Sequence, residues 1–493
     1  MIINTKSIVM KKKHLLLSTL LFCVIGLFSS CTEEKDNPVP TPVVNEDRVV
    51  FENQFSRDLQ TMADEFRFES LMQTTASVKE FISVLDEKAL SEQILKVLGN
   101  VINGLKATTL DKLPEADQAA AAACLAARFD LTTEEMKALP GFFIVDAYNS
   151  IGKMKVEFKE GKCTITNDAD AFTIVNTNAQ GETKTMALTF NDERDGVRFF
   201  VTRLGNVPVA IQLPKSIGVT LTTPQGKIVN GTINLTTIDP SQSQFVNFKV
   251  SGWVADGKLT ADVNNRQESV NLYVKHTETR AFDLQAAFEI SGREMASMEI
   301  YDMHDEYTDE EINSDTFKDL RNMGPFFSGA YDVLKALRGK SVDKIVITMN
   351  DNMVIDGKVD DIAKSLLALG NVRKLQGTKP GKETIDKYTQ ELNAQIHFTV
   401  SQKNTGITAQ ATLLTAQKEM LDGEYQPVVA LQFQGETEAK AMYDRMSQAD
   451  MENYKKMFSS FNSLAKEIGG TLIVAREKGE AIASAVKGYF NNL

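Results

Sequence analysis

The chain has 493 residues, a length typical of two or three domains. Apolar residues make up 42% and charged residues 24%, which excludes a largely disordered or fibrous protein. The formal net charge is −12, and it becomes −16 (50 basic against 66 acidic residues) without the lysines of residues 1–30, which argues against nucleic acid and anionic lipid surfaces as partners.

Residues 1–30 have the pattern of a signal peptide. Three lysines, Lys11 to Lys13, precede an apolar run from Leu15 to Phe28 that is too short to span a bilayer. Residues 27–31, Leu-Phe-Ser-Ser-Cys, resemble the lipobox of bacterial lipoproteins, although the family usually has Leu where Phe28 stands. The resemblance implies that the Cys31 thiol is acylated with diacylglycerol and that Cys31 becomes the N-terminus after cleavage.

Residues 31–48 are predicted to be a tether. The acidic run from Thr32 to Asp36 resembles the export signal that sends lipoproteins of the Bacteroidota to the outer face of the outer membrane. Alternating prolines in residues 37–44 hold the following stretch extended and deny it a packed structure. We therefore expect a lipid-anchored body at the outer membrane, facing the cell exterior.

Residues 49–147 are predicted to form a helical segment. Thr132 and Glu135 have the spacing of a capping box, which starts a short helix. The alanine-rich residues 119–123 favour another helix. The first helix carries an apolar stripe at helical spacing, which must be covered: Phe51, Phe55, Leu59, Met62 and Phe66.

Residues 148–303 are predicted to form an antiparallel sheet, because the apolar period changes there from 3.6 to 2. Short turns indicate hairpins between consecutive strands. The first hairpin should pair Phe158 with Cys163, and the second should pair Ile174 with Met186. Strands joined in this way form a meander with one wet and one buried face.

A third hairpin is predicted to turn at Asp256-Gly257 and to place Val254 opposite Leu259. Trp253 would then lie on the polar face of this hairpin. An indole in that position can stack on the ring of a ligand, or it can lie under a helix that covers the face. Trp253 is therefore the candidate ligand-binding residue.

Residues 304–493 are predicted to form a second α+β segment. A capping box at Thr308 and Glu311 opens it, and helices close it from Ala439 to the end with a break near Gly469-Gly470. The fold class is α+β, with a large antiparallel meander packed against helices and a helix-then-sheet order that is compatible with duplication. Its strands are expected at residues 345–349, 353–359, 396–400, 408–414 and 427–433.

No metal centre or cofactor is predicted. His276, His304 and His397 lie far apart, and the spacings HExxH and CxxC do not occur. An acidic cluster around His304 could offer carboxylates to calcium, but it lacks the calcium-loop pattern, and acidic residues are typical of a helix N-terminus. This cluster consists of Asp302, Asp305, Glu306, Asp309, Glu310 and Glu311.

No motif for a nucleophile is complete. Ser-x-x-Lys occurs at Ser341, Ser463 and Ser484, without the companion motifs of penicillin-binding enzymes. Gly339-Lys340-Ser341 matches the end of a phosphate loop, but Leu334 stands where the earlier glycine is needed. A glycosidase pair of carboxylates cannot be recognised from spacing, since folding brings such a pair together.

Cys124 and Cys163 are expected to act as small core hydrophobes. The exported compartment also permits a disulfide between them, so both interpretations stay open.

The sequence thus predicts an envelope lipoprotein whose specific role is not identified, favouring a non-enzymatic binding or structural module over an enzyme. Its membrane contact is the lipid at Cys31, its macromolecular or hydrophobic ligand is not identified, and no nucleic acid is expected. One alternative is a carrier of a hydrophobic ligand in a cavity between sheet and helices. Another is a secreted hydrolase, which would require two buried carboxylates or a Ser/His pair in a convergent pocket.

Overall fold

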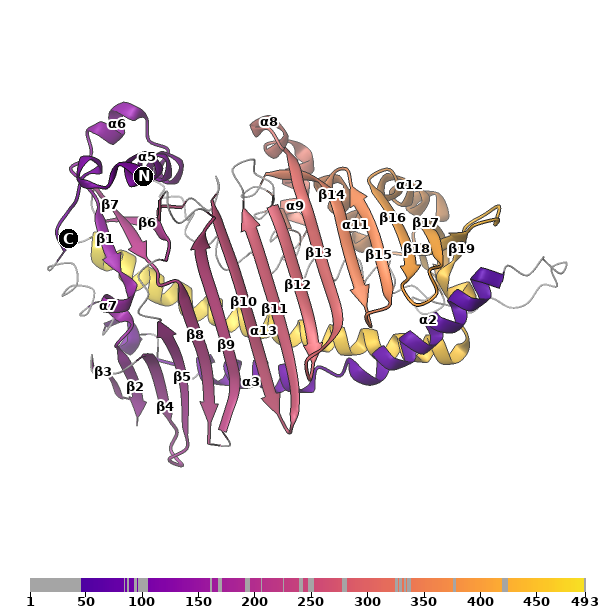
Figure 1. Cartoon of the computed structure of the whole chain (residues 1–493), viewed down its shortest axis with the longest axis horizontal. Coiled ribbons are helices and arrows are strands. Elements are labelled where there is room, and N and C mark those ends of the chain that lie inside the picture. The colour runs from indigo at the N-terminus through magenta and orange to yellow at the C-terminus, as the bar shows by residue number, and fades with distance from the viewer. Residues whose placement is uncertain are drawn as a thin grey trace. The chain divides into compact units, whose positions relative to one another are not determined.

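The structure, a computed structural model, describes residues 46–491 (Figure 1). The signal peptide, Cys31 and most of the tether lie outside this span. Within it, the description leaves out residues 84, 87, 93–94, 96–104, 160–161, 167–170, 191–195, 205, 225, 239–242, 247–251, 277–281, 324–326, 328–329, 332–333, 335–337, 376–377 and 419–423.

The described residues fall into two compact units. Unit 1 contains residues 46–67, 280–289 and 293–462, and unit 2 contains residues 68–279, 290–292 and 463–491. Each unit combines helices with strands that pair mainly antiparallel, which confirms the predicted α+β class. Within the described part of the chain, no helix has both the length and the hydropathy of a membrane span.

In unit 1, neighbouring strands of the sheet follow one another in chain order. The pairs from β13 to β19 are all antiparallel. The strands are β12 (Phe282–Ile290), β13 (Arg293–Glu306), β14 (Gly339–Met349), β15 (Met353–Val359), β16 (Ile396–Gln402), β17 (Thr408–Lys418), β18 (Glu424–Phe433) and β19 (Lys440–Ala441). The strand predictions for residues 345–433 are therefore confirmed.

The helices of unit 1 begin with α2 (Glu46–Glu65), whose predicted apolar stripe is buried from Phe51 to Phe66. The capping box of Thr308 and Glu311 is present and opens α8. The prediction assigned no element to residues 360–395, which form two helices. The remaining elements are α8 (Asp309–Ile312), α9 (Asp315–Asn322), α11 (Ile362–Lys374), α12 (Lys382–Asn393), the 3-10 helix η4 (Met442–Arg445) and the start of α13 (Gln448–Asn491).

Unit 2 contains two groups of strands. In the larger group the order is β11-β10-β9-β8-β5-β4-β2-β3. Its strands are β2 (Lys155–Lys159), β3 (Lys162–Thr166), β4 (Phe172–Thr177), β5 (Thr183–Phe190), β8 (Ser216–Thr223), β9 (Gly226–Thr237), β10 (Trp253–Val263) and β11 (Arg266–His276). The predicted pairs Phe158 with Cys163 and Ile174 with Met186 are confirmed, although the turn at 160–161 lies outside the described residues.

The smaller sheet of unit 2 interrupts the predicted meander. β1 (Phe143–Asp146) pairs parallel with β7 (Val207–Gln212), which also pairs with β6 (Arg198–Leu204). A second departure is the parallel pair β2 and β4. The helices of this unit include α3 (Glu69–Ser83), α5 (Glu115–Phe129), α6 (Thr133–Lys137), α7 (Ala147–Ile151) and α13 from residue 463 onward, with the 3-10 helix η2 (Leu110–Lys112).

The core of unit 2 forms where α3 covers one face of the larger sheet. Phe81 of α3 packs in one cluster with Val156, Phe158, Leu221 and Val229. A second cluster lies between α5 and the smaller sheet and includes Cys124. The alanine-rich helix and the capping box of Thr132 and Glu135 are both present as predicted.

The hairpin predicted at Asp256-Gly257 is wrong. β10 continues through both residues and pairs with β9 on one side and β11 on the other, so that Val254 lies opposite Lys275. The chain turns instead at Asn264-Asn265, whose φ angles are 54° and 63°. Gly257 marks a close approach, because an added Cβ would lie 3.2 Å from the Thr232 carbonyl oxygen.

The break predicted near Gly469-Gly470 is also wrong, because α13 runs through both glycines. A Cβ on Gly470 would lie 3.1 Å from Lys79 Nζ of α3, so this glycine also marks a close contact. Packing overrides the roughly 1 kcal/mol by which glycine disfavours a helix interior relative to alanine. The final helix begins at Gln448, later than the predicted Ala439, because β19 and η4 come first.

Candidate functional site

The candidate ligand residue Trp253 lies at the start of β10 and is only 3% exposed. It is opposite His276 of β11, with the two ring centroids 5.9 Å apart. The indole is therefore part of the interior of unit 2 in this structure. The other site residue predicted from the sequence, Cys31, lies outside the described residues.

Both body cysteines are free thiols. Cys124 is buried in α5, and burial raises the pKa of its thiol to about 12. Cys163 is half-buried in β3, where burial, followed by the charge of Asp86, also raises the thiol pKa. The structure thus contains the reduced alternative of the two that the sequence left open.

Three polar residues meet on β13 and β14 of unit 1. His304 and Ser341 lie directly opposite each other in the register, and Asp343 follows Ser341 by two residues. The distance from His304 Nδ1 to Ser341 Oγ is 2.7 Å, and that from His304 Nε2 to Asp343 Oδ2 is 2.8 Å. We refer to Ser341, His304 and Asp343 as the serine–histidine cluster.

These distances define one consistent set of proton positions for a neutral imidazole. Nε2 carries the proton and donates to Asp343, so Nδ1 is left to accept from the Ser341 hydroxyl. The Ser341 hydroxyl has two longer alternatives, since its Oγ lies 3.1 Å from both the His304 carbonyl oxygen and Asp305 Oδ2. Serine, imidazole and carboxylate in this order are the elements of nucleophilic serine chemistry.

Accessibility differs among the three side chains. Ser341 is 7% exposed, whereas the side chains of His304 and Asp343 are about half exposed. The cluster therefore lies at the surface, although the serine side chain itself is largely buried. The sequence pointed to His304 as part of the acidic cluster and to Ser341 as part of two motifs. No sequence pattern linked His304 with Ser341.

The acidic cluster predicted around His304 is largely used in local contacts. Glu311 closes the α8 capping box and accepts a hydrogen bond from Lys340, which holds the pKa of the Glu311 carboxyl below its usual value. Asp309 pairs with Arg338. No group of three ligands suited to a metal ion occurs among the residues that the structure describes.

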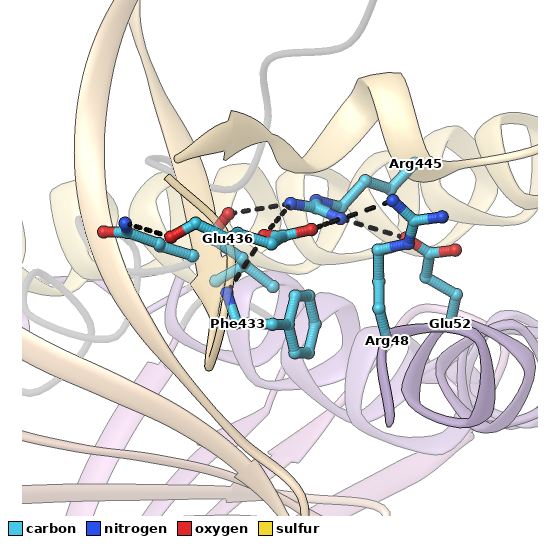
Figure 2. Close-up of polar contacts among 7 residues, drawn as sticks. Arg48, Glu52, Phe433, Glu436 and Arg445 are labelled. Carbon is cyan, nitrogen blue, oxygen red and sulfur yellow. Dashed lines mark hydrogen bonds and ion pairs between the residues drawn. The ribbon is translucent and has the colours of Figure 1, made fainter. Parts of the chain in front are cut away.

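A second polar arrangement fastens helix α2 within unit 1 (Figure 2). Arg445 of η4 donates from Nη2 to Glu436 Oε2 at 2.8 Å and from Nη1 to Glu52 Oε1 of α2 at 3.2 Å. Arg48 of α2 lies 3.6 Å from Glu52 and 3.7 Å from Glu436. We name Arg445, Glu436, Glu52 and Arg48 the Arg445 clasp.

The surroundings of the Arg445 clasp are largely buried. The guanidinium lies over the Phe433 ring, 5.0 Å from its centroid, and Phe51 of α2 packs edge-on against the same ring. Burial would raise the pKa of Glu436, but hydrogen bonds from Arg445 and from the Phe433 N–H outweigh it and hold the pKa below its usual value. No local sequence pattern predicts this contact between distant segments.

Comparisons with family models, curated proteins and solved structures found no match to this chain.

Proposed function

We propose that the protein is a lipoprotein of the outer membrane, anchored through lipid on Cys31 and displayed at the cell exterior, whose folded body binds a macromolecular partner. The observation that carries this proposal is the position of Cys31, directly after an apolar run of signal-peptide length. The Arg445 clasp supports it, because it joins α2, which begins at Glu46 just beyond the tether, to the rest of unit 1.

A binding role is supported by the polar face of the larger sheet in unit 2. On β9, Thr232, Asn234 and Thr236 alternate with apolar residues, and Asn234 donates a 2.7 Å hydrogen bond to Asp256 of β10. Lys258 and Thr260 continue the same face on β10. A broad face of hydroxyl, amide and charged groups offers hydrogen bonds to a hydrated partner.

The anchor is tested by replacing the thiol. Cys31→Ala should release the protein from the membrane fraction and abolish incorporation of labelled palmitate, because the thioether can no longer form. Cys163→Ala, which removes a body thiol, should leave both unchanged. Equal membrane retention of the Cys31→Ala and Cys163→Ala proteins would refute the anchor.

Surface display needs a separate test. Protease added to intact cells should digest the body, and replacing Glu33, Glu34 and Asp36 by their amides should protect it while leaving palmitate incorporation intact. A body that resists protease in the unaltered protein, although it is digested after lysis, would refute display at the cell exterior.

A second candidate, the carrier of a hydrophobic ligand, is favoured by one observation. Ile233 and Leu259 are exposed on one face of the larger sheet of unit 2. Ala261 and Val229 lie on the same face but are buried, and Val229 packs in the cluster that contains Phe81 of α3. An apolar strip beside a helix can take up an acyl chain. Native mass spectrometry of the purified protein should then show bound lipid that is lost in Leu259→Asp, whereas lipid-free protein would eliminate this candidate.

A further inference from the structure

We propose that Ser341 is a nucleophile activated by His304, and that it transfers small acyl groups from neutral carboxylic esters. This inference concerns unit 1 alone and does not depend on the anchor or on the partner of the body. It rests on the contacts of the serine–histidine cluster, in which the 2.7 Å distance from Ser341 Oγ to His304 Nδ1 is the shortest polar contact of the hydroxyl.

The backbone holds the reacting pair in place. Ser341 and His304 are cross-strand partners, and the neighbouring pair of Met303 with Val342 keeps the two strands in the same register. Asp343 fixes the imidazole by accepting from Nε2, which leaves the Nδ1 lone pair directed at the hydroxyl. Ser341 and His304 are thus the catalytic residues, and Asp343 is a positioning residue.

The surroundings of Ser341 indicate the substrate class. Because the Ser341 side chain is only 7% exposed, a small acyl group such as acetyl fits the site better than a bulky one. Asp305 lies 3.1 Å from Ser341 Oγ, and Asp343 lies next to the imidazole, so anionic esters are repelled. The half-exposed imidazole faces solvent, which allows the ester to be carried by a large molecule.

The chemical step is a two-stage transfer. Ser341 Oγ attacks the ester carbonyl carbon while its proton passes to His304 Nδ1, and the bond from that carbon to the alkoxy oxygen breaks as the imidazolium protonates the leaving alcohol. Water then attacks the acyl carbon and gives a proton to Nδ1, after which the bond from that carbon to Ser341 Oγ breaks and the imidazolium returns the proton to Oγ, releasing the carboxylic acid. General-base assistance of this kind contributes roughly 100- to 10,000-fold.

The test is covalent labelling of the full-length protein in detergent with a neutral fluorophosphonate probe, followed by peptide mapping. Labelling at Ser341 is expected, with at least a tenfold loss of rate in His304→Ala and complete loss in Ser341→Ala. Ser297→Ala is the matched control, because Ser297 lies on β13, the strand paired with that of Ser341, and its hydroxyl also contacts a carboxylate, that of Glu294. It should label like the unaltered protein.

Three further measurements separate chemistry from a structural role. Free imidazole should restore part of the labelling rate in His304→Ala, and hydrolysis of p-nitrophenyl acetate should follow the labelling rates. Asp343→Asn weakens the acceptor that orients the imidazole, so kcat for p-nitrophenyl acetate should fall with little change in KM. Asp343 and Asp305 are the charged groups that contact this imidazole among the described residues.

Absence of label at Ser341, or an equal rate of labelling in His304→Ala that folds normally by circular dichroism, would overturn the proposal. In either case the contact of Ser341 with His304 would be a structural hydrogen bond between strands.

Discussion

Arg445 and Glu436 form a two-pronged ion pair in unit 1, with nitrogen-to-oxygen distances of 2.8 and 3.3 Å, although their side chains are only 6% and 12% exposed. Pairs of this kind stabilise weakly as a whole, because removing both ions from water costs nearly as much as their attraction returns. Removing one partner destabilises the fold strongly, since the charge of the other partner then stays buried without its counter-ion. The Arg445 clasp therefore makes α2 sensitive to single substitutions.

Glu436→Gln should lower the free energy of unfolding by about 3 kcal/mol, the low end of the effect of breaking a buried pair, because glutamine keeps one acceptor for Arg445. Urea unfolding and hydrogen exchange of residues 46–55 in α2 measure it. Asp386→Asn is the control, since the exposed pair of Asp386 with Lys382 should contribute less than about 1 kcal/mol. If Glu436→Gln and Asp386→Asn lowered the free energy of unfolding by the same amount, the clasp would not be a major source of stability.

The stabilisation by Glu436 should depend on pH with a defined sign. Its pKa in the folded protein lies below the usual value, so the carboxylate stabilises fully above the unfolded pKa of about 4.5. This contribution disappears as the pH falls through the lowered pKa. The difference in urea midpoint between the unaltered protein and Glu436→Gln should be constant from pH 7 to 5.5 and shrink toward pH 3, whereas a constant difference throughout would be inconsistent with this assignment.

Glu268 of unit 2 should be as sensitive as the clasp. Its fully buried carboxylate accepts from the Leu71 N–H in the first turn of α3 at 2.8 Å and from Arg266 Nε at 2.7 Å. Glu268→Leu removes the acceptor from both donors and should cost about 3 to 5 kcal/mol. Urea unfolding followed by Trp253 fluorescence reports it, and Gln267→Ala at the neighbouring exposed position should change the midpoint little.

Thiol titration tests the cysteines and the anchor together. If lipid blocks Cys31 as proposed, purified mature protein in denaturant should show two reactive thiols, those of Cys124 and Cys163. Before unfolding, Cys124 should resist a disulfide reagent at pH 8, since its thiol is buried and its pKa is raised to about 12, and Cys163 should react first. No reactive thiol in denaturant would indicate a disulfide, and a third would indicate a free Cys31.

Local patterns predicted the parts of the fold that depend on neighbouring residues. The pairing of Phe158 with Cys163 follows from the length of one turn, and each capping box needs only four consecutive residues. The prediction of a turn at Gly257 was wrong, because glycine occurs both in turns and in strands that another backbone approaches closely. Only the partner strand distinguishes the two cases.

Contacts between distant segments could not be predicted in this way. β1 pairs with β7 across more than sixty residues, and no periodicity encodes that choice. Ser341 and His304 are 37 residues apart, and their contact follows from a register that becomes known only when β13 and β14 are paired. The two ends of the Arg445 clasp are separated by nearly the whole described chain.

The position of α2 has a mechanical consequence. If Cys31 is held in lipid as proposed, drag on the body would reach α2 at its first turns, where Arg48 and Glu52 lie. A load applied there would have to separate α2 from Phe433, which Phe51 contacts, and from Arg445, which Glu52 contacts. Under the proposed anchorage, the Arg445 clasp would thus reinforce the body at the point where the anchor pulls on it.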